Sequence, residues 1–158
     1  MLAIKILPQS MIATALLMLT FTSAAQPPTT ITTIADANSS PASYVDLGVA
    51  GPSIGDQYIF DQPLLDTDDQ VLGNNAGFCI RTQLDHSMQC QWTLTFANGS
   101  LQVAGRELDQ GLSSLAIIGG SGEFQGAFGE LQSTKNANGS FTQVVSYWLP
   151  SQSSSTVD

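Results

Sequence analysis

Glu107 has the strongest claim to chemistry in this sequence, because hairpin geometry predicts that its carboxylate points toward the apolar face of a β-sheet. Residues 88–97 alternate between apolar and polar side chains, and Asn98-Gly99 follows directly. A two-residue turn at Asn98-Gly99 would place Glu107 opposite Cys90, on the same face as Trp92. A carboxyl group buried there would have a raised pKa and could act as a general acid or base. The alternative is a position at the rim of the sheet, in water.

Other charged and titratable side chains could support this carboxylate. Arg81 lies two residues from Cys79 on the same strand face, so it is the expected counter-ion of a buried Glu107. We expect both Arg81 and Trp92 to contact a bound ligand, and we expect His86 to lie in a loop. One histidine and two cysteines cannot complete a zinc site, and no acidic run has the spacing of a calcium loop, so no metal ion is expected.

The elements that must position these side chains are β-strands. Runs of β-type residues recur at regular intervals, separated by turn residues, and no long helical period occurs. Gly119-Gly120-Ser121-Gly122 is expected to form a tight turn, and Asn138-Gly139 a second hairpin turn. The expected strands span residues 29–35, 57–65, 71–83, 88–97, 100–107, 113–118, 124–135 and 140–149. Eight antiparallel strands can close, so the predicted fold is all-β, an eight-stranded antiparallel barrel with a small internal cavity.

The two cysteines are expected to form a disulfide. The strand at residues 78–83 returns through a turn at residues 84–87, which places Cys79 directly across from Cys90. Such a bridge closes a loop of about a dozen residues and would contribute ~2–3 kcal/mol to stability. It also requires an oxidising compartment.

The amino terminus has the features of a secretory leader. Lys5 precedes an apolar stretch at residues 11–19, and Ser23-Ala24-Ala25 offers the small residues that signal peptidase accepts. The alternative is a membrane anchor, but the apolar stretch is shorter than the ~20 residues that span a bilayer. We therefore expect a secreted, extracellular or periplasmic protein. Its expected parts are a signal peptide at 1–25, an N-terminal segment with a first strand at 26–43, the barrel at 44–150 and a disordered tail at 151–158.

The charge of the chain argues against nucleic acid as a partner. The chain has 4 basic and 13 acidic residues and a net charge of −9, and removal of the leader with Lys5 would leave a net charge of −10. Contacts with a phosphate backbone or an anionic membrane surface need Lys or Arg side chains. Neither nucleic acid nor, after cleavage of the leader, a membrane is therefore an expected partner.

Three segments resemble the allene oxide cyclase and dirigent superfamily. They are Gly73–Cys79, Cys90–Thr93 and the glycine-rich Leu115–Glu130, of which the last is the most specific. The resemblance covers roughly residues 40–148. It implies an eight-stranded antiparallel barrel, commonly a homotrimer, with a hydrophobic cavity for a small molecule and no cofactor. Members of the superfamily either convert an unstable fatty-acid epoxide into a cyclopentenone or orient radicals and quinone methides during stereoselective coupling or cyclisation.

The resemblance also implies site residues. Ser40 and Pro41 match a Ser-Pro-Ala motif that helps the cyclases to hold a water molecule, and Gln62 stands where the cyclases have an amide. The catalytic glutamate of the cyclases falls near Thr32, and their pocket tyrosine falls at Glu107. The resemblance therefore implies that this chain carries its carboxylate on the other side of the expected cavity.

Three functions are compatible with these features. The leading one is a cofactor-independent cyclase or isomerase that binds a small hydrophobic, reactive intermediate, folds it into one reactive conformer and polarises one of its oxygens with Glu107 and Gln62. The second is a carrier that holds a small hydrophobic ligand in the same cavity without chemistry. The third is a secreted structural or interaction protein whose barrel is filled by its own side chains.

Overall fold

The computed structural model describes residues 26–150, which form nine β-strands and no helix. The signal peptide predicted at 1–25 and the tail predicted at 151–158 lie outside the described residues. Between residues 26 and 150 there is no helix long and apolar enough to cross a membrane. The strands are β1 (Thr29–Ala35), β2 (Ser43–Val45), β3 (Gln57–Leu65), β4 (Val71–Gln83), β5 (Ser87–Phe96), β6 (Gly99–Leu108), β7 (Leu112–Gly122), β8 (Phe128–Lys135) and β9 (Phe141–Trp148).

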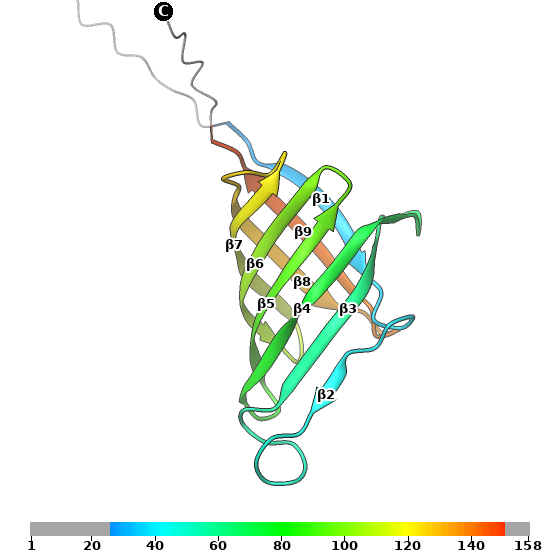
Figure 1. The fold of residues 1–158 in the computed structure, drawn as a ribbon, viewed down its shortest axis with the longest axis vertical. Coiled ribbons are helices and arrows are strands. Elements are labelled where there is room, and N and C mark those ends of the chain that lie inside the picture. The colour runs from blue at the N-terminus through cyan, green and yellow to red at the C-terminus, as the bar shows by residue number, and fades with distance from the viewer. Residues whose placement is uncertain (1–25, 151–158) are drawn as a thin grey trace, which may run out of the picture.

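Eight of these strands close into an antiparallel barrel, which confirms the predicted fold (Figure 1). Each strand from β3 to β8 pairs with its successor, and β1 completes the ring by pairing with β9 along its whole length and with β3 at Ile34 and Ala35. The short β2 pairs with another part of the same edge of β3. We call the end of the barrel that carries β2 and the loop after it the lower end, as drawn in Figure 1; the described chain enters and leaves at the upper end.

The β5–β6 hairpin has a different register from the predicted one. Its turn residues are Ala97-Asn98, so that Glu107 pairs with Met88 and not, as predicted, with Cys90. A side chain at Gly99 would lie 2.2 Å from a backbone oxygen of β7, so this glycine is required by the close approach of β7 rather than by the turn. The register differs by two residues, which is one full side-chain period, so every residue of β6 keeps its predicted face.

The glycine-rich segment Gly119–Gly122 is a strand and not the expected tight turn. It forms the last part of β7 and pairs with β6 at Gly99–Gln102, past a bulge at Ile118 of β7. A Cβ atom on Gly120 would lie 2.4 and 2.6 Å from two backbone oxygens, so the missing side chain lets neighbouring backbone segments approach closely. The turn into β8 follows later, and β8 begins at Phe128 rather than at residue 124.

Two other hairpin predictions are confirmed. β8 and β9 pair up to Lys135 and Phe141, and Gly139 lies in their connection with φ of 92°. β4 and β5 pair so that Cys79 faces Cys90, and the predicted disulfide joins them with Cα atoms 4.0 Å apart. His86 lies in the turn between these two strands, as expected.

The interior is packed most tightly with apolar side chains toward the upper end. Phe124 in the β7–β8 turn contacts Phe96 and Tyr147, with ring centres 5.3 and 5.6 Å apart. Fully buried aliphatic side chains continue this core, namely Leu64, Leu94, Leu101, Val103, Leu131 and Val145. Because these side chains close the upper part of the barrel, any internal space must open toward the lower end.

Candidate functional site

A cavity of about 120 Å³ lies inside the barrel, toward the lower end. This volume is close to the ~150 Å³ of an engineered protein cavity that holds benzene, so the space suits one six-membered ring. Among residues 26–150, no group of three or more His, Cys, Asp or Glu side chains is placed to hold a metal ion. The wall of the cavity consists of Ala42, Tyr58, Phe60, Gln62, Asn75, Cys79, Met88, Trp92, Glu107, Ser133, Phe141 and Gln143.

Glu107 lines this cavity from β6 and is only 6% exposed, so its side chain lies in the interior of the barrel and not at the solvent-exposed rim. Ser133 Oγ on β8 donates a hydrogen bond of 3.0 Å to Glu107 Oε1, whereas Glu107 Oε2 has no hydrogen-bond partner. Burial raises the pKa of this carboxyl group above its ordinary value, and the neighbouring hydroxyl groups of Ser133 and Ser113 oppose the rise only in part. The carboxyl is therefore biased toward its neutral form, with one oxygen free for a ligand.

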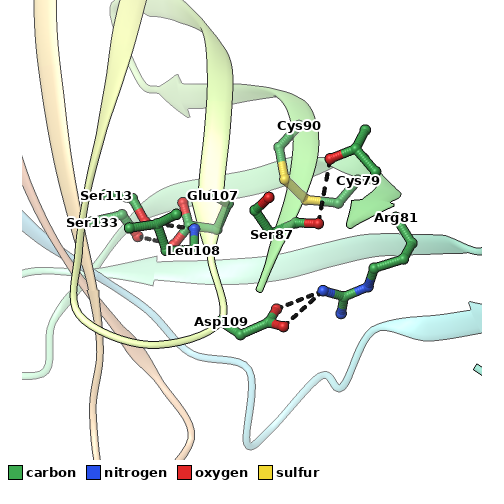
Figure 2. Close-up of a disulfide and its surroundings, with 10 residues drawn as sticks. Cys79, Arg81, Ser87, Cys90, Glu107, Leu108, Asp109, Ser113 and Ser133 are labelled. Carbon is green, nitrogen blue, oxygen red and sulfur yellow. Dashed lines mark hydrogen bonds and ion pairs between the residues drawn. A yellow bond between two sulfur atoms is a disulfide. The ribbon is translucent and has the colours of Figure 1, made fainter. Parts of the chain in front are cut away.

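Arg81 is not the counter-ion of Glu107, contrary to our expectation. Its Nη1 atom contacts the two carboxylate oxygens of Asp109 at 2.7 and 2.8 Å, and its guanidinium carbon lies 5.7 Å from the ring centre of Tyr58. Figure 2 shows Arg81 directed toward Asp109, while Glu107 lies apart with two serine side chains. Asp109 follows Glu107 by two residues at the partly exposed lower rim, where an ion pair forms with less loss of hydration than in the cavity. Arg81 is accordingly not part of the cavity wall.

Three buried polar atoms without hydrogen-bond partners belong to side chains of residues that line the cavity. They are Asn75 Oδ1, Trp92 Nε1 and Glu107 Oε2, in side chains of residues that are 3%, 4% and 6% exposed. Buried polar atoms in proteins are nearly always hydrogen-bonded, so three exceptions in side chains around one space make this cavity the candidate site. Sequence analysis missed Asn75; the available signal was its place on the same face of β4 as Cys79, two side-chain periods away.

Trp92 owes its position to a glycine other than the predicted one. Trp92 pairs with Val103 on one side and with Gly77 on the other, whereas Gly105, its predicted partner, lies opposite Cys90. A Cβ atom on Gly77 would lie 2.4 Å from the Cβ of Trp92. The indole ring therefore fits against β4 because residue 77 has no side chain.

The residues suggested by the Ser-Pro-Ala motif and the amide position separate in space. Gln62 is buried and lines the cavity from β3. Ser40 donates a hydrogen bond of 2.7 Å from its hydroxyl to the backbone oxygen of Asp61, and Pro41 is exposed. Neither Ser40 nor Pro41 is part of the cavity wall, although the next residue, Ala42, is.

The loop between β2 and β3 is tied to the lower rim through Asp56. This buried carboxylate accepts hydrogen bonds from the Tyr44 hydroxyl at 2.5 Å, from the Leu47 amide at 3.0 Å and from the Ser53 amide at 2.6 Å. The bond from Tyr44, followed by those from the two amides, lowers the pKa of Asp56, and the same contact raises the pKa of Tyr44 to about 12. Tyr44 also packs against Tyr58 in the cavity wall, with ring centres 5.1 Å apart. The loop and the cavity wall are thus one connected structure.

Several solved structures share this fold. Pyocyanin demethylase superposes with a TM-score of 0.61 and 24% identity, covering 75% of this chain and 99% of its own. The pterocarpan synthase dirigent protein PsPTS1 has a TM-score of 0.61 and 19% identity, covering 78% of this chain and 96% of its own. The Diels–Alderase AbmU from Streptomyces koyangensis has a TM-score of 0.60 and 18% identity, covering 82% of this chain and 72% of its own. At these identities the likeness concerns the fold alone.

The sequence itself decides the family. No match is found among curated proteins. The family model for Dirigent-like protein matches residues 18–149, which is most of the chain. Together with the closed antiparallel barrel, this match shows that the chain belongs to the dirigent-like family.

Proposed function

We propose that the protein binds a small, mainly apolar reactive molecule in the barrel and directs its stereoselective cyclisation or isomerisation. The observation that carries the proposal is the buried carboxyl group of Glu107, which leaves Oε2 unpartnered at the wall of a cavity about the size of one ring. A purely structural barrel would gain nothing from a desolvated acid, because an apolar side chain at this position would be more stable.

The proposed chemistry needs only residues of the chain. The walls, including Phe60, Trp92 and Phe141, would hold the substrate in one conformer and exclude water. As the ring closes, the proton of Glu107 Oε2 passes to a substrate oxygen on which negative charge develops, and the carboxylate then recovers a proton from the cyclised product. The hydrogen bond from Ser133 holds Oε1, so that Oε2 is the oxygen that exchanges the proton.

The structural neighbours support this proposal by analogy. Two are named pterocarpan synthase dirigent proteins and two are named Diels–Alderases, so proteins of this fold include catalysts of ring formation. The third function considered above, a barrel filled by its own side chains, is disfavoured by the cavity. A non-catalytic carrier remains the alternative that an experiment must separate from an enzyme.

The test compares Glu107→Gln with Glu130→Gln, a matched change at an exposed glutamate on β8. Each protein is incubated with a panel of small compounds that cyclise spontaneously to racemic products of one ring, and the rate and enantiomeric excess are measured by chiral chromatography. We expect an enantiomeric excess with the wild type and with Glu130→Gln. Loss of the general acid should slow the directed reaction by about 10²–10⁴-fold while leaving ligand affinity nearly unchanged.

Two results would contradict the enzyme proposal in different ways. Binding of panel compounds with no change in rate or enantiomeric excess indicates a carrier. Turnover that is unchanged in Glu107→Gln removes this residue from the mechanism while leaving the cavity in place.

We also propose that the mature protein is exported and acts outside the reducing cytoplasm. The leader-like segment at residues 1–25 supports this, and so does the Cys79–Cys90 disulfide, because such bonds persist in oxidising compartments. The family resemblance further suggests a homotrimer. Native mass spectrometry of the exported protein measures leader removal, disulfide state and subunit number together; an unprocessed chain with free thiols would contradict export.

A further inference from the structure

The unpartnered atoms of the cavity specify the chemical class of the ligand, an inference that rests on the proposed function because it assumes that the cavity admits a ligand. We propose that Trp92 Nε1 and Glu107 Oε2 donate two hydrogen bonds to a carbonyl oxygen, and that Asn75 Oδ1 accepts one from a hydroxyl or NH group of the same ring-sized molecule. The ligand class is therefore a hydroxy- or amino-substituted cyclic ketone or enone.

The donor pair follows from the chemistry of the two groups. The indole Nε1 of Trp92 carries a hydrogen and can only donate. Ser133 already donates to Glu107 Oε1, so the proton of the neutral carboxyl group belongs on Oε2, the oxygen that has no partner. Burial favours this neutral form. A carbonyl oxygen has two lone pairs and accepts from both donors. A hydroxyl oxygen also has two lone pairs, but it brings a hydrogen that needs an acceptor of its own, and an alkene offers no lone pair at all.

The acceptor atom Asn75 Oδ1 favours a ketone that carries a hydroxyl or NH group over an unsubstituted ketone. Asn75 Oδ1 is buried without a donor and is part of the same cavity wall as the two donors. A ligand that carries a hydroxyl or NH group beside its carbonyl would satisfy all three atoms. Their present lack of partners costs free energy, and the ligand would recover it on binding.

The charge of the wall excludes anionic ligands. The described residues that line the cavity include no Lys, Arg or His, and Arg81 at the nearby rim is paired with Asp109. A carboxylate or phosphate ligand would meet an acid at Glu107 and no cation, so its burial would be strongly unfavourable. The apolar side chains Phe60, Met88 and Phe141 instead contact a neutral ring.

The test uses four soluble six-membered rings as probes: cyclohex-2-enone, 2-hydroxycyclohexanone, cyclohexene and cyclohexanecarboxylate. Dissociation constants are measured by isothermal titration calorimetry on the wild-type protein at pH 5, and for the carboxylate at pH 7, where that probe is ionised. We expect the enone to bind at least about fivefold more tightly than cyclohexene, the value of one net hydrogen bond. The hydroxyketone should bind more tightly still, and the carboxylate should not bind.

Matched variants assign the preference to its atoms. Trp92→Phe should weaken enone binding about fivefold and leave the binding of cyclohexene unchanged. Trp148 is the control, because its indole nitrogen donates to Gln26 O at 2.7 Å outside the cavity. Trp148→Phe should change the binding of neither ring. Asn75→Ala should remove the advantage of the hydroxyketone over the enone. The same change at Asn74, which is adjacent in sequence but not part of the cavity wall, should not.

The pH profile reports on Glu107 independently of turnover. Enone affinity should fall as the pH rises through the raised pKa of Glu107, because the carboxylate repels the carbonyl oxygen that the neutral acid attracts. Glu107→Gln keeps a donor on the side chain, so it should bind the enone without this pH dependence. Among the described residues of the wall, Tyr58 on β3 is the other titratable side chain, and the charged Arg81–Asp109 pair lies nearby at the rim. Tyr58→Phe is therefore the control, and it should keep the pH profile of the wild type.

The outcomes distinguish the inference from the proposed function. Rings that bind equally well with and without a carbonyl would overturn the donor site and leave the cavity as a binding site. Preference for the carboxylate would overturn it as well. If none of the four rings binds, both the ligand class and the proposed function fail. If the enone preference is present but no cyclisation is directed, the ligand class holds for a carrier.

Discussion

Replacing Glu107 with Met should make the protein more stable and abolish its proposed activity. The carboxyl group is buried, and Oε2 has no hydrogen-bond partner, which costs ~1–3 kcal/mol relative to a satisfied or apolar group. Met has similar length and no polar group to desolvate, but it loses the hydrogen bond from Ser133, worth ~1 kcal/mol. The net gain is therefore up to about 2 kcal/mol near pH 8.

The gain should depend on pH in a defined direction. The pKa of Glu107 is raised in the folded state above its ordinary value of 4.5, so folding favours the protonated form. The wild-type protein is thus stabilised by this group below its ordinary pKa and loses that contribution as the pH rises through the raised pKa. Other titrating groups are common to both proteins and cancel in the difference. The advantage of Glu107→Met should be smallest near pH 4, where the carboxyl group is neutral, and reach its full value above the raised pKa.

Thermal unfolding followed by circular dichroism at pH 4 and pH 8 measures this difference. For the 125 residues from 26 to 150, an unfolding entropy of ~2.1 cal/mol/K per residue converts 2 kcal/mol into a rise in Tm of about 8 °C. Glu130→Met, at an exposed position, is the control and should shift Tm by less than about 2 °C at both pH values. A Glu107→Met protein that is less stable than the wild type at pH 8 would refute the argument, because it would show that the carboxyl group is satisfied and serves the fold.

Two further predictions concern the framework of the site. Reduction of the Cys79–Cys90 disulfide, or its replacement by two alanines, should lower the free energy of unfolding by about 3 kcal/mol, because the bond closes a loop between residues 11 positions apart. Urea denaturation with and without reductant measures this free energy. A change below ~1 kcal/mol would contradict the prediction. Asp56→Asn should increase hydrogen–deuterium exchange in residues 46–55, since it weakens the contacts with Tyr44 and the loop amides. Because the pKa of Asp56 is lowered in the folded wild type, these contacts are intact above its ordinary pKa and weaken as the pH falls through the lowered pKa. The wild type and Asp56→Asn should therefore exchange alike in strong acid. The control Asp85→Asn, in an exposed turn, should match the wild type at every pH.

The barrel could be predicted from local signals because each strand is specified by the alternation of residues that are close together in the chain. Alternation over residues 88–97 fixes which side chains of β5 face inward, and the turn at 84–86 sets Cys79 against Cys90. The inward direction of Glu107 survived an error in register, since a shift of two residues preserves the face of every side chain.

The glycines show where local reasoning fails. Gly99 and Gly120 were interpreted as turn residues, yet both lie in strands where a side chain would collide with a neighbouring backbone oxygen. Whether a glycine serves a turn or a close approach depends on a segment that is distant in sequence. The role of Gly77, which makes room for Trp92, could not be predicted either, because Trp92 lies on the neighbouring strand.

The sequence alone therefore determined the strands, the disulfide and the inward face of Glu107, because a period of two and short hairpins are encoded within a few residues. Only the tertiary structure decided that Arg81 turns to Asp109 and that Asn75 and Trp92 meet Glu107 at one cavity. Asn75, Trp92 and Glu107 come from the neighbouring strands β4, β5 and β6, and closure of the barrel between β1 and β3 places Ser133 of β8 and Gln143 of β9 around the same cavity. No local pattern connects these two groups of strands. The chemistry of the site lies in those long-range contacts, since the partner of a buried polar atom is whichever group the closed barrel places against it.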